Sequence, residues 1–280
     1  MASSYKDLKA MDRNSIRAAI RGGAYRSHTA GLAPKVLQSN LAILPERYAL
    51  DFMRFCQRNP KPCPLSGVSD TGNPMMFTLG HDIDIRTDVP AYNIYRNGKL
   101  SDTVSDIADI WQDDLVAFAL GCSFTFEHAL MHSGVELWHI ENNTTVPMFR
   151  SNIETVPSGP FHGKMVVSMR AVPANQLELV SGISRRFPHA HGGPVHTGDP
   201  AQIGIKDIAS PEWGDPAPVP DGHVTVFWAC GVTPQVAIEQ AGLPICITHK
   251  PGHMLITDVP EDAENPIIQN SRPQTTGFDQ

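Results

Sequence analysis

Histidines and an aspartate gather in residues 187–200, which read FPHAHGGPVHTGDP. Glycine and proline interrupt both helices and strands, so we expect a shaped loop here. His196, followed three residues later by Asp199, has the residue types of a proton-transfer pair, because imidazole exchanges protons near neutral pH. We therefore predict that His196 and Asp199 are catalytic and lie in a cleft. We expect His196→Ala to lower turnover by roughly 100-fold or more.

The same loop leaves two alternatives open. His191, His196 and Asp199 could ligate a metal ion, since imidazole and carboxylate are common metal ligands. The loop could also be purely structural. Its spacing matches no regular metal-ligand pattern, and we therefore expect neither a metal nor a cofactor.

A strand, a turn of small residues and a helix are predicted in residues 116–134, VAFALGCSFTFEHALMHSG. The free backbone N–H groups at the start of such a helix can hold a carboxylate or an oxyanion. We predict a catalytic role for Cys122 and Ser123 at this turn. Cys122 could be a thiolate nucleophile or a small buried filler, and we favour an anion-binding turn over covalent chemistry.

Residues 224–242, VTVFWACGVTPQVAIEQAG, repeat this order of strand, turn and helix. Thr233 has the residue type of a helix N-cap and Pro234 that of a first helical residue. We predict that Cys230, Gly231 and Thr233 bind substrate, with an ordinary structural turn as the alternative. The two segments together suggest a weak internal duplication.

Two arginines are candidates for binding a substrate carboxylate. Residues 82–90, DIDIRTDVP, alternate apolar and charged residues, which predicts a strand with one charged face. Arg86 could clamp a carboxylate there with Asp88 holding it in place, or form a surface salt bridge. Arg170 ends the apolar run KMVVSMR, and ligands of open α/β sheets bind at the carboxyl ends of strands.

The remaining elements predict an α/β fold, a mixed sheet with flanking helices, possibly in two lobes. The first sixty residues are interpreted as helical, with helices after Asp12 or Asn14 and from Pro45. Strands are predicted at residues 76–79, at 92–95 before an Asn-Gly turn, at 135–140 and at 243–249. We expect residues 1–280 to form a single unit, with an insertion at 195–222 and a polar tail from about 260.

The composition excludes several classes of protein. The chain of 280 residues has a formal net charge of −7 and lacks a basic run, so we expect no nucleic-acid partner. We expect no membrane partner, because no apolar stretch approaches the roughly 20 residues of a membrane helix. Five scattered cysteines and an N-terminus without a signal-like apolar core indicate a cytoplasmic protein. A homo-oligomer is possible.

The strings GCSFTFE, HGGPVHTGDP and FWACGVTPQ resemble the bacterial hydro-lyase family that is grouped with D-glutamate cyclase. The resemblance runs from about Arg17 to Asp258. It implies a carbon–oxygen lyase acting on a small carboxylated metabolite, by dehydrating cyclisation of an acidic amino acid, as from D-glutamate to 5-oxo-D-proline. His189 precedes the family motif and is not counted as a site residue. A metal-dependent lyase and a non-catalytic module that binds an acidic metabolite remain the alternatives.

Overall fold

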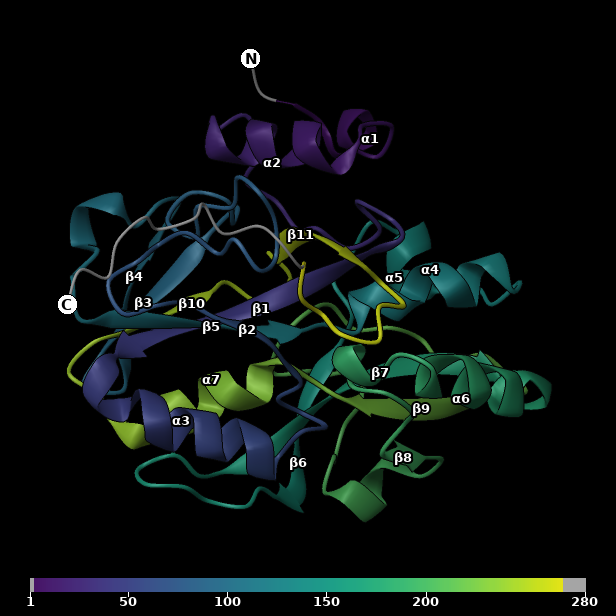
Figure 1. Cartoon of the computed structure of the whole chain (residues 1–280). Helices are drawn as coiled ribbons and strands as arrows, with labels where there is room; N and C mark the ends of the chain where they lie inside the picture. Colours follow the sequence, from purple (N-terminus) through teal and green to yellow (C-terminus); the bar gives the residue numbers. More distant parts are fainter. Residues whose placement is uncertain (1–2, 269–280) are drawn as a thin grey trace.

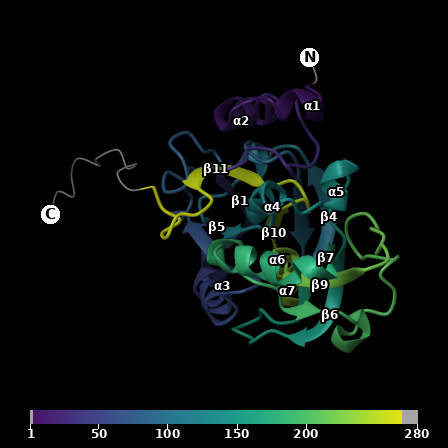
Figure 2. The ribbon, with the colours of Figure 1, turned by 90° about the vertical axis from the view of Figure 1, so that its right-hand side faces the viewer.

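The computed structural model describes residues 3–268, which form two β-sheets with helices around them (Figures 1 and 2). Each strand pair with an identified register is antiparallel. The predicted α/β class with flanking helices is confirmed. Most of the predicted polar tail, residues 269–280, lies outside the described part. No helix among residues 3–268 is both long and apolar enough to cross a bilayer.

The larger sheet has seven strands and is centred on β1, which is buried along its whole length. Helices and loops cover both of its faces, which explains why the sequence of β1 shows no alternation of apolar and polar residues. Its strands, in spatial order, are β2 (Leu65–Val68), β5 (Leu115–Gly121), β1 (Val36–Pro45), β10 (Cys246–His249), β3 (Tyr92–Arg96) and β4 (Lys99–Val104), and β11 (Leu255–Pro260) also pairs with β1.

The smaller sheet has four strands, and its two faces pack in different hydrophobic clusters. Trp228 lies on the face toward the rest of the protein, and its neighbour Phe227 lies on the other face, as the alternation of side chains along a strand requires. The strands, in order, are β6 (Met148–Glu154), β7 (Lys164–Pro173), β9 (His223–Ala229) and β8 (His196–Thr197).

Seven α-helices are assigned among the described residues. Helices α3 and α7 lie on the opposite side of the larger sheet from α1 and α2 (Figure 1). The helices are α1 (Tyr5–Leu8), α2 (Arg13–Arg21), α3 (Glu46–Arg58), α4 (Phe124–His132), α5 (Trp138–Glu141), α6 (Leu177–Arg185) and α7 (Val232–Ala241). Short 3₁₀ turns are η1 (Ala108–Ile110), η2 (Ala174–Gln176), η3 (Pro188–Ala190) and η4 (Pro200–Ile203).

Several predicted elements are confirmed: α2 with Asp12 as its N-cap, the hairpin of β3 and β4, and the strand–turn–helix order of both matching segments. Helix α3 is also present, and it begins at Glu46, one residue after the predicted Pro45, which is its N-cap. Other predictions were wrong. Residues 36–45 form the central strand rather than part of a helical region, residues 76–79 and most of 82–90 form turns, and 135–140 lead into the short helix α5. Short apolar runs do not distinguish buried strand from helix, so packing decides between them.

Candidate active site

The two matching turns lie against each other across the side chain of Asn40. Asn40 Nδ2 donates hydrogen bonds to the carbonyl oxygens of Gly121, at 2.9 Å, and Leu120, at 3.2 Å. A Cβ added at Gly231 would lie 2.1 Å from the same Nδ2, so only glycine fits there. The first turn, between β5 and α4, and the second, between β9 and α7, therefore meet in the interior.

Each helix is tied to a strand by a threonine in its first turn. Thr125 Oγ1 accepts a hydrogen bond from the backbone N–H of Gln38 at 3.1 Å, and Thr233 Oγ1 accepts one from Val166 at 2.9 Å. The N-cap of α7 is Gly231 rather than Thr233, so the predicted N-cap was wrong. The Thr233 hydroxyl is engaged by β7 and holds α7 in place.

The thiols at the two turns are buried and protonated. Burial raises the pKa of Cys122 far above its ordinary value, and burial raises the pKa of Cys230 to about 11. Cys230 Sγ lies 3.5 Å from Met148 Sδ, in apolar surroundings. Thiolate nucleophiles occur in electropositive, accessible surroundings that lower the pKa. The arrangement therefore favours chemistry that does not pass through a thioester.

Arg170 joins the first turn to the smaller sheet. It lies within β7 rather than at its end and is 3% exposed. Its guanidinium lies over the rings of Phe126 and Trp228, 5.4 and 5.2 Å from their centroids. It donates to Ser123 Oγ at 3.0 Å and to Ser168 Oγ at 3.2 Å. Because a guanidinium only donates, both hydroxyls keep their own proton to offer to another group.

Glu127 and His139 complete this cluster, although neither was predicted. Glu127 Oε1 accepts hydrogen bonds from His139 Nε2, at 2.8 Å, and from Arg170. Burial raises the pKa of Glu127, but the charges of His139 and Arg170 and their hydrogen bonds outweigh it and lower the pKa to about 2. Glu127 is therefore an ionised carboxylate in the interior. Its sequence signal was a lone acidic residue within the apolar run FTFEHAL.

Four buried polar atoms around this cluster have no hydrogen-bond partner within the described part of the chain. They are Gln38 Oε1, Glu127 Oε2, His191 Nε2 and Trp228 Nε1. Most buried polar groups of folded proteins are paired, so unpaired ones that gather in one place indicate a site that awaits water or a ligand.

The loop of residues 187–200 divides between two sides of the smaller sheet. Its first half packs on the first turn so closely that a Cβ at Gly121 would lie 1.6 Å from the carbonyl oxygen of His189. His191 is held in the left-handed region at φ 75°, and its Nδ1 donates to the carbonyl of Lys61 at 2.8 Å. Its Nε2 therefore carries a lone pair. Burial lowers the pKa of His191 to about 4, and the charge of Arg170 contributes.

The second half of the loop does not reach the cluster. His196 pairs with Phe227 across β8 and β9 and contacts its ring, on the opposite face of the sheet from Arg170. His196 Nε2 donates to the backbone carbonyl of Asp199 at 2.8 Å, whereas the Asp199 carboxylate accepts from the N–H of Ala201. The expected position of His196 beside either turn was therefore wrong.

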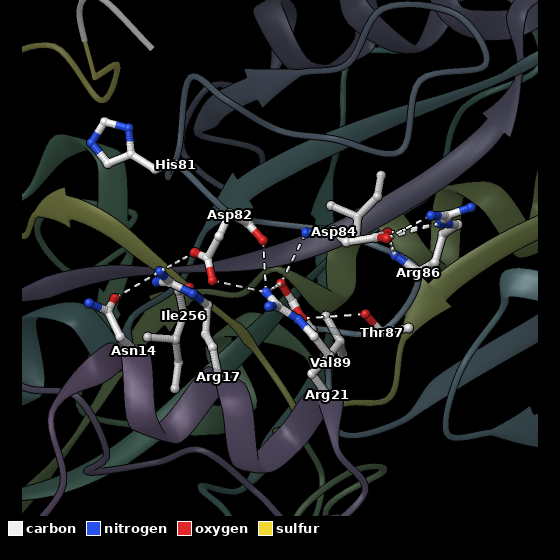
Figure 3. Close-up of polar contacts among 12 residues, drawn as sticks. Asn14, Arg17, Arg21, His81, Asp82, Asp84, Arg86, Thr87, Val89 and Ile256 are labelled. Atoms are coloured by element: carbon white, nitrogen blue, oxygen red, sulfur yellow. Dashed lines mark hydrogen bonds and ion pairs between the residues drawn. The ribbon is translucent and has the colours of Figure 1, made fainter. Parts of the chain in front are cut away.

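Arg86 also lies away from the cluster. It pairs with Asp84 at 2.7 Å (Figure 3). Asp88 pairs instead with Arg21 at 2.7 Å, so the expected contact of Arg86 with Asp88 does not form. Its neighbour Ile85 packs in a different hydrophobic cluster from Cys122. Within residues 3–268, no group of three or more histidine, cysteine or acidic side chains is placed to hold a metal.

Buried ionisable groups with shifted pKa values concentrate at functional sites, and such a cluster lies beside the first turn. The model of the D-glutamate cyclase family matches residues 116–258. A relative from Dinoroseobacter shibae is 71% identical over 96% of this chain and 89% of its own length. One from Ruegeria pomeroyi is 70% identical over 97% and 99%. Both are named "Putative hydro-lyase".

The chain therefore belongs to the D-glutamate cyclase family, as the resemblance of its motifs indicated, and the predicted class of carbon–oxygen lyase is confirmed. Among solved structures, a nitrogen repressor-like protein of Methanococcus jannaschii aligns with 84% of this chain and 91% of its own, at a TM-score of 0.38 and 12% identity. That likeness is too low to inform the fold or function.

Proposed function

We propose that the protein removes water from a small acidic amino acid by cyclisation, as from D-glutamate to 5-oxo-D-proline, at the cluster around Arg170 and Glu127. The observation that carries the proposal is the burial of a guanidinium, an ionised carboxylate and two imidazoles at the junction of the two turns. Family membership supports the loss of water.

The reaction makes defined demands on the site. The amine nitrogen forms a bond with the side-chain carboxyl carbon, and a carbon–oxygen bond of that carboxyl breaks. Two protons leave the ammonium nitrogen and depart with the oxygen as water, so the reaction needs no net acid or base. It needs a group that accepts and returns protons, and donors that stabilise the tetrahedral oxyanion.

The residues of the cluster can meet these demands. The free hydroxyl protons of Ser123 and Ser168 and the charge of Arg170 suit an oxyanion, because low-dielectric surroundings strengthen such contacts. The lone pair on His191 Nε2 can accept a proton, and a nearby anionic substrate raises the proton affinity of an imidazole. Glu127 holds His139 in orientation. Cys122, Cys230 and Gly231 shape the turns.

The direct test is incubation of the purified protein with D-glutamate and with L-glutamate, followed by chiral chromatography for 5-oxoproline. We expect conversion by the wild type and a loss of roughly 100-fold or more in Arg170→Lys, which cannot make the same fork of hydrogen bonds. Arg86→Lys is the matched control and should retain full turnover, because Arg86 pairs with Asp84 outside the cluster.

Absence of 5-oxoproline from either isomer, at any protein concentration, would refute the proposed reaction. Binding of glutamate without turnover would then favour a module that senses an acidic metabolite. The metal-dependent alternative lacks support from geometry, since His191 and His196 contact different parts of the fold.

A further inference from the structure

A pocket of about 180 Å³ lies between α4 and residues 31–36, where the chain enters β1. This volume is several times the roughly 30 Å³ that one water occupies in the liquid. It is smaller than the roughly 300–1,000 Å³ of pockets that take drug-sized ligands. The pocket therefore suits a small metabolite.

Two of the unpaired buried oxygens belong to residues that line this pocket, Glu127 and Gln38. His139 and Arg170 occupy Glu127 Oε1, which leaves Oε2 without a partner among the described residues. Gln38 Nε2 donates to the carbonyl of Leu32 at 2.8 Å, which fixes the amide and leaves Oε1 as an acceptor. Both atoms need a donor, and an ammonium group carries three N–H donors.

The mouth of the pocket is cationic. Lys9 and Lys35 line it and are exposed, so both lysines lie on its solvent side. Glu261 also lines the pocket, but its carboxylate is engaged by His128, at 3.5 Å, and by the backbone N–H of Lys35, at 3.0 Å. A ligand entering here meets two lysines outside and Glu127 and Gln38 inside.

The N-terminal helices hold this mouth in place. Tyr5 of α1 donates through its hydroxyl to the carbonyl of Ala30 at 2.7 Å, and the Lys9 ammonium lies over the Tyr5 ring. Helix α2 is fixed by the buried ion pair of Arg17 with Asp258, at 2.7 Å. Arg17 also pairs with Asp82 at 2.7 Å (Figure 3). The position of Lys9 therefore follows from contacts remote in sequence.

We infer that this pocket binds a small amino acid, with its ammonium group on Glu127 Oε2 and Gln38 Oε1 and its α-carboxylate toward Lys9 and Lys35, which leaves the side-chain carboxyl to react on the side of Ser123 and Arg170. The inference rests on the proposed function in that it places the substrate of that reaction. The two lysines suit the α-carboxylate, and the ammonium group distinguishes an amino acid from a plain dicarboxylic acid.

The test uses D-aspartate and succinate, which share a carbon skeleton and two carboxylates and differ in the ammonium group. D-aspartate would have to close a strained four-membered ring, so binding is measured without turnover. In titration calorimetry we expect D-aspartate to bind roughly 10-fold or more tightly than succinate, because charge-assisted hydrogen bonds to buried acceptors are strong. Equal or tighter binding of succinate overturns the inference, as does binding of neither, which leaves a pocket for water.

Variants locate the site. Lys35→Met should weaken both ligands by roughly 3-fold or more, and it should fold because Lys35 is exposed. Lys6→Met, also exposed on α1 and not lining the pocket, is the charge-matched control and should change neither affinity. Glu127→Gln should abolish the preference for D-aspartate. Weakening by Lys6→Met equal to that by Lys35→Met would mean non-specific attraction and overturn the inference.

The binding test and the turnover test fail separately. If D-glutamate yields 5-oxoproline while D-aspartate and succinate bind alike, the pocket is wrong and the reaction stands. If D-aspartate is preferred while neither isomer of glutamate reacts, the pocket stands and the reaction is wrong.

Discussion

The two turns at the centre of the molecule share one plan and differ in charge. Glu127 of α4 contacts His139, and Gln235, at the matching place in α7, contacts His249, with its Nε2 3.3 Å from His249 Nδ1. Strand β7 pairs with β9 of the second segment as β1 pairs with β5 of the first. By this register Arg170 of β7 corresponds to Ala42 of β1. The half of the molecule's centre around Glu127 and Arg170 therefore has a carboxylate and a guanidinium. The half around Gln235 has an amide and the methyl group of Ala42 at the matching places.

This difference indicates that one cluster can be reactive while the matching one is purely structural. The Gln235–His249 half is neutral: the backbone N–H of Leu41 donates to His249 Nδ1 at 3.1 Å, and burial lowers the pKa of His249 to about 3. Such a cluster can hold α7 against the larger sheet without reacting. The correspondence is what the predicted internal duplication would produce, and the duplication itself stays a prediction.

The largest expected effect separates the two halves directly. Glu127→Gln should lower 5-oxoproline formation roughly 1,000-fold, because it removes the buried negative charge and the orientation of His139. Gln235→Met should lower turnover less than about 10-fold, while reducing the melting temperature through the lost hydrogen bonds to His249. Steady-state kinetics and thermal unfolding of both variants decide. Equal losses of turnover in both would remove the distinction between the halves.

The two halves of the histidine loop should differ in the same way. His191→Asn should reduce kcat by roughly 100-fold, since it removes the free Nε2 lone pair inside the cluster. His196→Asn should change kcat by no more than about 3-fold, because His196 lies on the other face of the sheet. Kinetic constants over a range of pH give the comparison. A larger loss in His196→Asn would return the second half of the loop to the active site.

Acid should weaken the fold through the buried imidazoles. The unfolded pKa of histidine is about 6.5, and burial lowers those of His191 and His249 to about 4 and about 3. Between these values the unfolded chain binds more protons, so the free energy of unfolding falls as pH drops from about 6.5. We expect a loss of roughly 1 kcal/mol or more per histidine by pH 5. Urea unfolding at pH 7 and 5 measures it, and His249→Asn should reduce the difference.

Protonation of Glu127 should also lower the free energy of unfolding, but at lower pH than protonation of the histidines. Its pKa is about 2 in the folded protein, below that of an unfolded glutamate, so its contribution to stability is present above about pH 4.5 and disappears as pH falls toward 2. Glu127→Gln should therefore flatten the acid limb of the stability curve. An unchanged limb would contradict the pairing of Glu127 with His139 and Arg170.

The smallest expected effect concerns the thiol. Cys122→Ala should change turnover by less than about 10-fold, because burial keeps the thiol protonated and a carboxylate is a poor electrophile for it. The variant's unfolding midpoint controls for a packing defect. A loss of more than about 1,000-fold in a well-folded variant would point to a covalent intermediate and against the neutral role of the thiol.

The sequence was informative where local chemistry decides the structure. Asp12 caps α2, glycine ends α7, and the Asn-Gly pair closes the hairpin of β3 and β4, all as their residue types predict. The two strand–turn–helix segments were also predicted, because an apolar run followed by small residues and a helical pattern leaves few alternatives.

The site could be predicted only in part, because tertiary contacts choose which polar residues meet. The sequence predicts Arg170 and Ser123 as site residues, and the structure brings them together. The sequence did not predict Glu127 and His139 as site residues, because their pairing depends on how α5 packs on α4. His196 was selected on residue type, but the register of a two-residue strand turns it to the other face.

The most direct test of the account is a crystal structure of the wild-type protein with D-aspartate, the unreactive acidic amino acid. The account predicts its ammonium group within hydrogen-bonding distance of Glu127 Oε2 and Gln38 Oε1, with its α-carboxylate toward Lys9 and Lys35. D-aspartate bound instead beside Gln235 and His249, or beside His196 and Asp199, with the pocket at Glu127 holding only water, would contradict it.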